Sequence, residues 1–405
     1  MTITTDRSWE TALRPDTPEG WVRRAEEVAA VLASDAVQRD QANEAPFAEV
    51  ALLKRSGLVT LLGPPEHGGG GADWVTAYRV TREIAKADGS IGQLLGYHYL
   101  WNWLPRFWGT REQWERLEAE AAREQWLFGG AVNPRDDDLV VRDAGDHLVF
   151  NGRKSFSTGG RVTDVIVLEG VLEGTEDHVF AIVPSESPGV VRNSDWDNIG
   201  QRLSESGSVE LHDVRAEWKN ALGYVDKKFQ PRVYNTLTTP AIQLVFVNLY
   251  LGIAQGALQT AVAYTRTKTR AWLHGVTDDP LDDPYILATY GDLASELYAL
   301  EALVDKAGEE IQRVHDDPDA LTERRRGEVA VLIAAAKIRS TRVALDVTSR
   351  IFEVTGARST ASALGLDRFW RNVRTHTLHD PVAYKLRELG VYVLRDEIPQ
   401  PTWYS

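Results

Sequence analysis

The segment RFWRNVRTHTLHDPVAYK, residues 368–385, carries three arginines, one lysine, two histidines and one aspartate, threaded with apolar residues. His376 and His379 are three positions apart and therefore lie on one face of a helix. Pro381 disfavours helical geometry at Asp380, so we expect the two imidazoles at a helix end. Three interpretations are open: a charged surface turn, a metal site of two histidines and a carboxylate, or a site for an anionic, reactive ligand.

Apolar residues in the same segment bear on this choice: Phe369, Trp370, Val373 and Leu378. They predict a half-buried segment, which disfavours a solvated turn. A metal site is disfavoured because the adjacent His379 and Asp380 would point in different directions, and because the sequence has no H-E-x-x-H motif. We therefore expect no metal, and the rest of the chain has to decide between a turn and an anionic ligand.

The sequence around this segment divides into three regions. Residues 235–405 carry long amphipathic stretches with short connections, which predict a helical bundle. Residues 126–234 contain short runs rich in Val, Ile, Phe and Leu between turn residues, which predict antiparallel strands. Residues 1–125 show the three-and-four spacing of helices with one buried face. We expect an α+β, mostly α fold with an N-terminal helical domain, a central barrel-like β-domain and a C-terminal bundle with a tail.

Charge and cysteine content exclude several classes of protein. Forty-five Lys and Arg against 59 Asp and Glu give a net charge of −14, which argues against nucleic acid or an anionic membrane as partner. No apolar run approaches the roughly 20 residues of a membrane helix, and the N-terminus lacks the order of a secretion signal. With no cysteine, disulfides and thiolate catalysis are impossible, so we expect a cytoplasmic protein.

Two further segments are candidates for a site. In GQLLGYHYLWNWLPRFWG, residues 92–109, His98 stands in an apolar helical pattern and is either a core histidine or a catalyst. In NGRKSFSTGGRVTD, residues 151–164, the run from Phe156 to Gly160 ends a strand with small, flexible residues. That run is either a plain hairpin turn or a place where a planar ligand approaches backbone N–H groups closely.

These segments together resemble a known family. The motifs LGIAQGALQTAVAYTRTKTRAW, EVTGAR, GRKSFSTG and SDWDNIGQRLSESGS are similar to those of the acyl-CoA dehydrogenase superfamily. Within it, GADW, REIAKADGSIGQLLGYH and the 369–385 segment most resemble flavin-dependent monooxygenases similar to dibenzothiophene monooxygenase. The resemblance covers about residues 17–395. It implies an N-terminal helical domain, a β-domain and a C-terminal four-helix bundle, assembled as a homotetramer around flavin.

The resemblance also implies an activity. The protein would take reduced FMN (FMNH₂) from a separate NAD(P)H:flavin reductase, since the chain has no G-x-G-x-x-G nicotinamide fingerprint. With O₂, and through a C4a-hydroperoxyflavin, it would oxygenate a small heteroaromatic, sulfur- or nitrogen-containing compound such as dibenzothiophene or indole. One alternative is an FAD-dependent acyl-CoA-type dehydrogenase, although Asp380 before a proline is a doubtful α-proton base. Another is a non-catalytic flavin-binding protein.

The resemblance assigns roles to individual residues. The expected catalytic residues around the oxygen are His98, Thr158 and His379. The expected flavin-binding residues are Phe156, Ser157, Trp196, Arg270, Arg358 and His376. The two arginines would bind the phosphate, from a neighbouring subunit in the assembled protein. Gly130 stands where sulfur-oxidising relatives place an asparagine, which predicts a differently shaped pocket.

Overall fold

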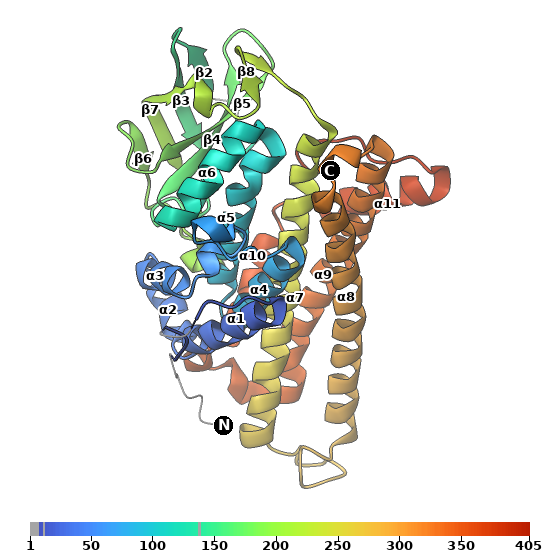
Figure 1. The fold of residues 1–405 in the computed structure, drawn as a ribbon. Coiled ribbons are helices and arrows are strands. Elements are labelled where there is room, and N and C mark those ends of the chain that lie inside the picture. The colour runs from blue at the N-terminus through green and yellow to red at the C-terminus, as the bar shows by residue number, and fades with distance from the viewer. Residues whose placement is uncertain (1–7, 11–12, 137–138) are drawn as a thin grey trace.

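The computed structural model describes residues 8–10, 13–136 and 139–405, and its first part is helical (Figure 1). The helices are α1 (Pro18–Ala33), α2 (Ala36–Ala42), α3 (Phe47–Arg55), α4 (Trp74–Ala87), α5 (Gly89–Trp108) and α6 (Arg111–Glu124). Side-chain caps define several helix starts: the Asp73 carboxylate accepts the Thr76 N–H at 2.8 Å, and the Asp88 carboxylate accepts the Ser90 N–H at 3.0 Å. These caps fix where α4 and α5 begin, and α5 forms one wall of the site.

The strands follow between residues 128 and 229. They are β1 (Phe128–Ala131), β2 (Val140–Asp143), β3 (His147–Lys154), β4 (Val165–Leu172), β5 (His178–Pro184), β6 (Val190–Arg192) and β7 (Val209–Glu217), with a small hairpin of β8 (Tyr224–Val225) and β9 (Lys228–Phe229). The seven-stranded sheet has the order β1-β4-β2-β3-β7-β6, and β5 pairs with β4.

The expectation of a purely antiparallel sheet is wrong, because β4 pairs in parallel with both β1 and β2. Parallel neighbours need a crossover rather than a hairpin, and the chain supplies it by running through β2 and β3 before β4. Alternating strand patterns alone do not distinguish the two pairings.

The C-terminal part contains three long helices and two short ones. They are α7 (Thr238–Lys268), α8 (Pro284–Asp316), α9 (Glu323–Thr355), α10 (Asp367–His376) and α11 (Val382–Arg395). The helix α11 is not predicted from the sequence, because Pro381 is interpreted there as the end of the helical pattern in the 368–385 segment. Pro381 in fact precedes the first helical residue, where its missing N–H costs nothing. The mostly α, α+β class is confirmed.

Two hydrophobic cores hold the fold together. The larger joins the N-terminal and C-terminal helices, with α7 packed against α4, α5 and α9. The smaller lies within the sheet around residues such as Phe150 and Leu211. Phe128 and Phe180 come from strands but belong to the larger core, so the sheet is fastened to the helices along α5 and β1. The site opens at this junction.

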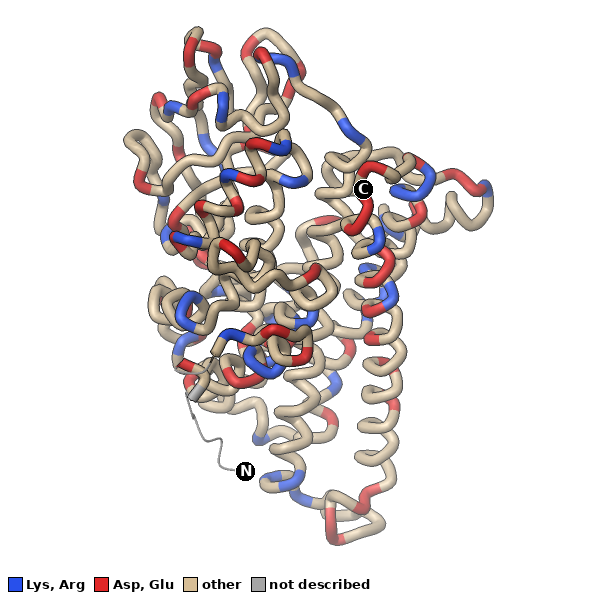
Figure 2. The backbone as a smooth tube through the Cα atoms, viewed as in Figure 1, with Lys and Arg blue, Asp and Glu red and all other residues tan. Residues whose placement is uncertain are grey.

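The helix α7 is long and apolar enough to cross a membrane by length and composition alone. The segment Val233–Lys268 has a mean hydropathy of 1.6 in its most apolar window, but 83% of that window is buried inside the protein. It is therefore accounted for as the central core helix. Figure 2 shows acidic and basic residues interspersed along the backbone over helices and sheet alike.

Candidate active site

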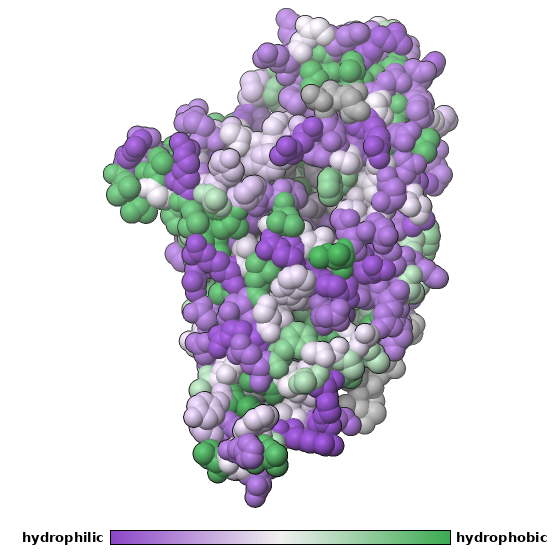
Figure 3. Space-filling model, turned by 180° about the vertical axis from the view of Figure 1, so that it is seen from behind, coloured by the Kyte–Doolittle hydropathy of each residue, from purple (hydrophilic) through white to green (hydrophobic). Residues whose placement is uncertain are grey.

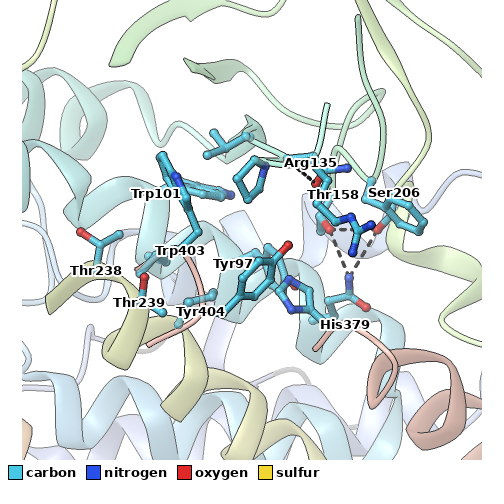
Figure 4. Close-up of a pocket in the computed structure, with 18 of the residues that line it drawn as sticks. Tyr97, Trp101, Arg135, Thr158, Ser206, Thr238, Thr239, His379, Trp403 and Tyr404 are labelled. Carbon is cyan, nitrogen blue, oxygen red and sulfur yellow. Dashed lines mark hydrogen bonds between the residues drawn. The ribbon is translucent and has the colours of Figure 1, made fainter. Parts of the chain in front are cut away.

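A cavity of about 1070 Å³ opens between α5, the sheet, the N-terminal end of α7, the end of α10 and the C-terminal tail (Figure 4). This is at the upper end of the range for ligand sites, roughly 300–1,000 Å³, and leaves room for two bound molecules. One end is largely aromatic, with the hydroxyls of Thr238 and Thr239 beside the rings (Figure 4), and is lined by Trp101, Trp108, Phe180, Phe229, Ile242 and Trp403. The other end is polar, lined by Gln93, Thr158, Gln201, Ser206, Arg374 and His379.

One face of α5 forms a wall of this cavity. Its members are Gln93, Tyr97, Leu100 and Trp101, spaced as neighbours on a helix surface. Each residue of an α-helix is rotated by about 100° from the one before it. His98 therefore points away from the cavity that Tyr97 faces.

His98 is a buried structural histidine, and its predicted catalytic role is not supported by this geometry. Its Nε2 lies 2.7 Å from the Val59 carbonyl, and its Nδ1 accepts the Phe128 N–H at 3.0 Å. Both ring nitrogens are thus occupied by backbone groups, with the proton on Nε2. Burial lowers the pKa of His98 to about 4, so the ring is neutral. It joins α5 to β1 and cannot donate to a ligand.

Thr158 lies at the polar end, in the loop that follows β3. Its hydroxyl is 2.9 Å from the Ser206 hydroxyl and accepts a hydrogen bond from the Gln93 amide at 3.1 Å (Figure 4). Ser157 does not face the cavity: it is fully buried, and its N–H donates to the Gly207 carbonyl at 2.8 Å. Ser157 therefore holds the loop in place, and a direct contact with flavin is not supported.

Phe156 and Trp196, both predicted to bind flavin, line the polar end of the cavity as an aromatic pair. Their ring centroids are 6.1 Å apart in an edge-to-face arrangement. Phe156 is 64% exposed and has a φ of 54°, a left-handed conformation that is costly for an aromatic residue. The Trp196 indole N–H donates to the Gln201 carbonyl at 2.8 Å. Two aromatic faces are thus presented to a planar ligand.

His376 and His379 both line the cavity, but their surroundings differ. α10 ends at His376, whose Nδ1 is 2.8 Å from the Tyr250 hydroxyl and whose Nε2 is 3.2 Å from the Tyr97 hydroxyl. Burial lowers the pKa of His376 well below its ordinary value. His379 lies in the following turn with 39% of its side chain exposed, and its ring stacks on His376 at 6.0 Å. His379 is the imidazole that can touch a ligand and exchange a proton.

Asp380 points into the protein rather than into the cavity. Its carboxylate is 3.1 Å from the Lys337 ammonium and accepts from the Gln243 amide at 3.3 Å. The buried Lys337 holds the pKa of Asp380 well below its usual range. A carboxylate held ionised in this way, and turned away from the ligand, is not placed to abstract a substrate proton. This geometry argues against the dehydrogenase alternative.

Arg270 and Arg358 are not near this cavity within one chain. Arg358 donates to the carbonyl of Lys268 at the far end of α7, and Arg270 is exposed just beyond. The nearest cavity residue to this end of α7 is His376, which contacts Tyr250, and the 18 residues from Tyr250 to Lys268 put the arginines about 27 Å beyond it by helix rise. Their predicted contact with the flavin phosphate therefore cannot be made within one subunit.

Several buried polar groups in the cavity wall have no hydrogen-bond partner within the described residues. They are Gln93 Oε1, Trp101 Nε1, both amide atoms of Gln201, Arg374 Nε and Thr375 Oγ1. Unpaired buried polar groups are costly, so a cluster of them around one cavity indicates a ligand that pairs them. Arg374 was not singled out in advance, because it is one of three arginines in the 368–385 segment. The other two have partners within the protein: Arg371 pairs with Asp40, and Arg368 donates to the Gly365 carbonyl at 3.0 Å.

In the described part of the chain, no three His, Asp or Glu side chains gather in a way that could hold a metal ion. The two histidines of the segment stack on each other, and their neighbouring carboxylate is paired with Lys337.

Buried neutral histidines make the stability of this protein depend on pH. Burial lowers the pKa of His98 to about 4 and that of His315 to about 3, against 6.5 in an unfolded chain. Below pH 6.5 the unfolded chain binds protons that the folded protein excludes. The free energy of unfolding should therefore fall between pH 6.5 and 4, by about 3 kcal/mol for His98 alone. Calorimetry at pH 5, run in buffers of different ionisation enthalpy, should detect uptake of about two protons on unfolding from these two histidines, whereas no uptake would contradict the neutral assignment.

Comparison with known proteins identifies the family. The acyl-CoA dehydrogenase N-terminal domain family matches residues 22–125, and the acyl-CoA dehydrogenase C-terminal domain family matches residues 244–383. A dibenzothiophene monooxygenase of Mycolicibacterium goodii is 40% identical over 100% of both chains. A protein of Pseudomonas putida named probable FMNH₂-dependent monooxygenase SfnC is 38% identical, over 94% of this chain and 96% of its own.

A solved structure shows the same fold with ligands. TdsC from Paenibacillus sp. A11-2, in complex with FMN and indole, superposes with a TM-score of 0.90 at 37% identity, over 95% of this chain and 100% of that one. These relatives favour the flavin monooxygenase interpretation over the acyl-CoA-type dehydrogenase alternative. The chain belongs to the acyl-CoA dehydrogenase superfamily and, within it, to the family of flavin-dependent monooxygenases that includes dibenzothiophene monooxygenase.

Proposed function

We propose that this protein is an FMNH₂-dependent monooxygenase that uses O₂ to oxygenate a small aromatic, sulfur- or nitrogen-containing compound. The observation that carries the proposal is the division of one large cavity into a polar end with unpartnered groups and an aromatic end. The polar end suits a flavin ring and the aromatic end suits an apolar substrate beside it. The relatives described above, named for dibenzothiophene and bound to FMN and indole, support the same pairing.

The residues at the polar end fit a flavin ring. The pyrimidine edge of the ring alternates hydrogen-bond donors and acceptors, and the Gln201 amide offers one of each, both buried and unpartnered. Arg374 supplies a cation for a reduced ring that carries negative charge. Phe156 and Trp196 supply faces for the planar system. When bound, reduced FMN would supply the electrons that activate O₂.

Thr158 and His379 are the groups of this chain best placed to act on the oxygen. Both line the cavity, one on each side of the polar end (Figure 4). The Thr158 hydroxyl can donate a hydrogen bond, while Gln93 and Ser206 fix its position. The His379 imidazole lies at the cavity surface and can carry a proton on either ring nitrogen, which suits it to deliver a proton.

The aromatic end determines which substrates fit. A side chain at Gly130 would place its Cβ 2.5 Å from the Trp101 ring, so Gly130 is what allows the indole of Trp101 to occupy this position. The Trp101 N–H is buried and unpartnered. We infer that the chain prefers a flat substrate that carries a hydrogen-bond acceptor.

Reduced FMN is proposed to come from a separate reductase in the cytoplasm. The purified protein should be nearly colourless, and it should oxygenate dibenzothiophene, indole, alkyl sulfides or amines only when FMN, NADH and a flavin reductase are added together. Omitting the reductase is the internal control. Stoichiometric FAD that survives purification, with dye reduction by an acyl-CoA, would contradict the proposal.

A homotetramer would bring Arg270 and Arg358 to a cavity. The loop between α7 and α8 exposes Trp272, Leu273 and Val276, at 72%, 86% and 78% of their surfaces. Figure 3 shows hydrophobic side chains interspersed with polar ones at the lower end of the molecule. Apolar surface of this kind supports contact with another copy of the chain. Sedimentation should give a tetramer at micromolar concentration, and a stable monomer would contradict this arrangement.

Arginine replacements test the phosphate contact directly. Arg270→Ala or Arg358→Ala should weaken FMNH₂ binding by about 1.5–3 kcal/mol, the scale of a hydrogen bond to a charged group. Folding should be unaffected, because both side chains are exposed. Arg23→Ala, on the exposed face of α1, is the matched control and should leave binding unchanged. Equal FMNH₂ affinity in all three variants would mean that other residues bind the phosphate.

A further inference from the structure

A chain of four hydrogen-bonded side chains runs from the cavity wall into the protein interior. The Tyr97 hydroxyl is 3.2 Å from His376 Nε2, and His376 Nδ1 is 2.8 Å from the Tyr250 hydroxyl. The Lys337 ammonium donates to the Tyr250 oxygen at 3.3 Å. Tyr97 and His376 line the cavity, whereas Tyr250 and Lys337 are fully buried behind them. The proposed function uses neither Tyr250 nor Lys337.

Lys337 is charged in this position. A buried carboxylate needs a counterion, and the Lys337 ammonium is 3.1 Å from the Asp380 carboxylate. The ammonium also lies over the rings of Phe246 and Tyr250, at 4.6 and 5.0 Å from their centroids. An ammonium group donates hydrogen bonds and cannot accept them.

The charge on Lys337 determines which group donates and which accepts in each hydrogen bond of this series. The Tyr250 oxygen accepts from Lys337, so the single Tyr250 proton is directed onward. Its shortest contact is His376 Nδ1, at 2.8 Å. The other acceptor, the His376 carbonyl, is farther away at 3.1 Å and also accepts the N–H of His379 at 3.0 Å, so we assign the proton to the shorter contact with Nδ1. A neutral imidazole carries one proton, so the proton of His376 is on Nε2 and is donated to the Tyr97 oxygen.

We propose that Lys337 is a positioning residue that fixes this direction and thereby aims the Tyr97 proton into the cavity. Within the described chain, His376 is the hydrogen-bond partner of the Tyr97 hydroxyl, and it supplies a donor. The Tyr97 proton therefore remains for an acceptor atom of a bound ligand. That Tyr97 then serves oxygenation rests on the proposed function, but the direction of the hydrogen bonds does not.

The direction can be measured in the cofactor-free protein. Nitrogen-15 NMR of labelled histidine, with the His376 signal assigned by its loss in His376→Gln, should show the Nε2–H tautomer. In Lys337→Met and in Tyr250→Phe the signal should shift toward a mixture of tautomers. Lys154→Met is a matched control, since it breaks a buried pair with Glu169 in the sheet and should leave the His376 signal unchanged. An Nδ1–H tautomer in the parent protein, or no shift in Lys337→Met, would overturn the proposal.

A second measurement uses the protein loaded with reduced FMN. Tyr97→Phe and Tyr250→Phe should each lower the product formed per reduced flavin consumed by about tenfold, the size of one lost hydrogen bond, with hydrogen peroxide formed instead. The KM for substrate should stay unchanged, and Tyr250→Phe leaves the Lys337–Asp380 pair in place in case Lys337→Met does not fold. Unchanged coupling in both variants would overturn the role of Tyr97. If the parent protein oxygenates nothing, the proposed function fails while the tautomer result stands.

Discussion

Replacing His379 by phenylalanine should lower oxygenation about 10²–10⁴-fold, the range for loss of a positioned proton donor. His379 lines the cavity with 39% of its side chain exposed, and phenylalanine preserves its packing against Phe246 and the ring of His376. Reduced flavin should still be consumed, because O₂ still enters the cavity, but hydrogen peroxide should replace the product. Peroxide released per FMNH₂ consumed, measured together with a thermal melt, gives both quantities.

His98→Phe is the matched control for this experiment. His98 bonds the backbone at Val59 and Phe128 and does not face the cavity, so its loss should lower the melting temperature and leave coupling per folded molecule unchanged. Buried polar groups left unpaired cost about 1–3 kcal/mol. The opposite pattern, with His98→Phe uncoupled and His379→Phe fully coupled, would contradict the assignment of the two histidines.

Breaking the buried ion pair should have the largest effect on stability. Lys337→Met leaves the Asp380 carboxylate buried without its cation, and such a loss costs about 3–5 kcal/mol. Lys337 has no exposed surface, and Asp380 only 3%, so solvent does not screen the pair. Chemical denaturation of Lys337→Met should show a lower midpoint at an unchanged slope.

A double variant separates the ion pair from simple packing. In Lys337→Met with Asp380→Asn the orphan charge is removed, so most of the loss in unfolding free energy should be recovered. If the double variant is as unstable as Lys337→Met alone, the cost comes from packing around Phe246 rather than from the unpaired carboxylate.

The sequence was sufficient for the fold class and for the segment at the centre of the site. The density of charge and imidazole at 368–385, next to Pro381, correctly indicated a helix end with two histidines, and these line the cavity. The strand ending at 154 and the following loop likewise placed Thr158 and Phe156 in the wall. A helix end and a loop after a strand can be predicted from a sequence because each is formed by residues that are adjacent in the chain.

The sequence did not predict which way individual side chains point, or which distant segments of the chain lie together. The resemblance implied a catalytic role for His98, and Tyr97 was not named, yet adjacent positions of a helix face different ways and Tyr97 is the one that lines the cavity. The cavity face of α5 could have been found from the four-residue spacing of Gln93, Tyr97 and Trp101. Parallel pairing of β4, and the unpartnered Arg374, depend on segments far apart in the chain. No local pattern encodes them.

The central claim is that one cavity holds reduced FMN beside an aromatic substrate and transfers oxygen to it. The most direct test supplies the protein with FMN, NADH, a flavin reductase, oxygen-18-labelled O₂ and either dibenzothiophene or indole. Mass spectrometry should show oxygen-18 incorporated into the product from O₂, with formation dependent on the reductase and lowered about 10²–10⁴-fold in His379→Phe. Product carrying oxygen from water, or complete conversion of the electrons to hydrogen peroxide with every substrate in the panel, would contradict the account.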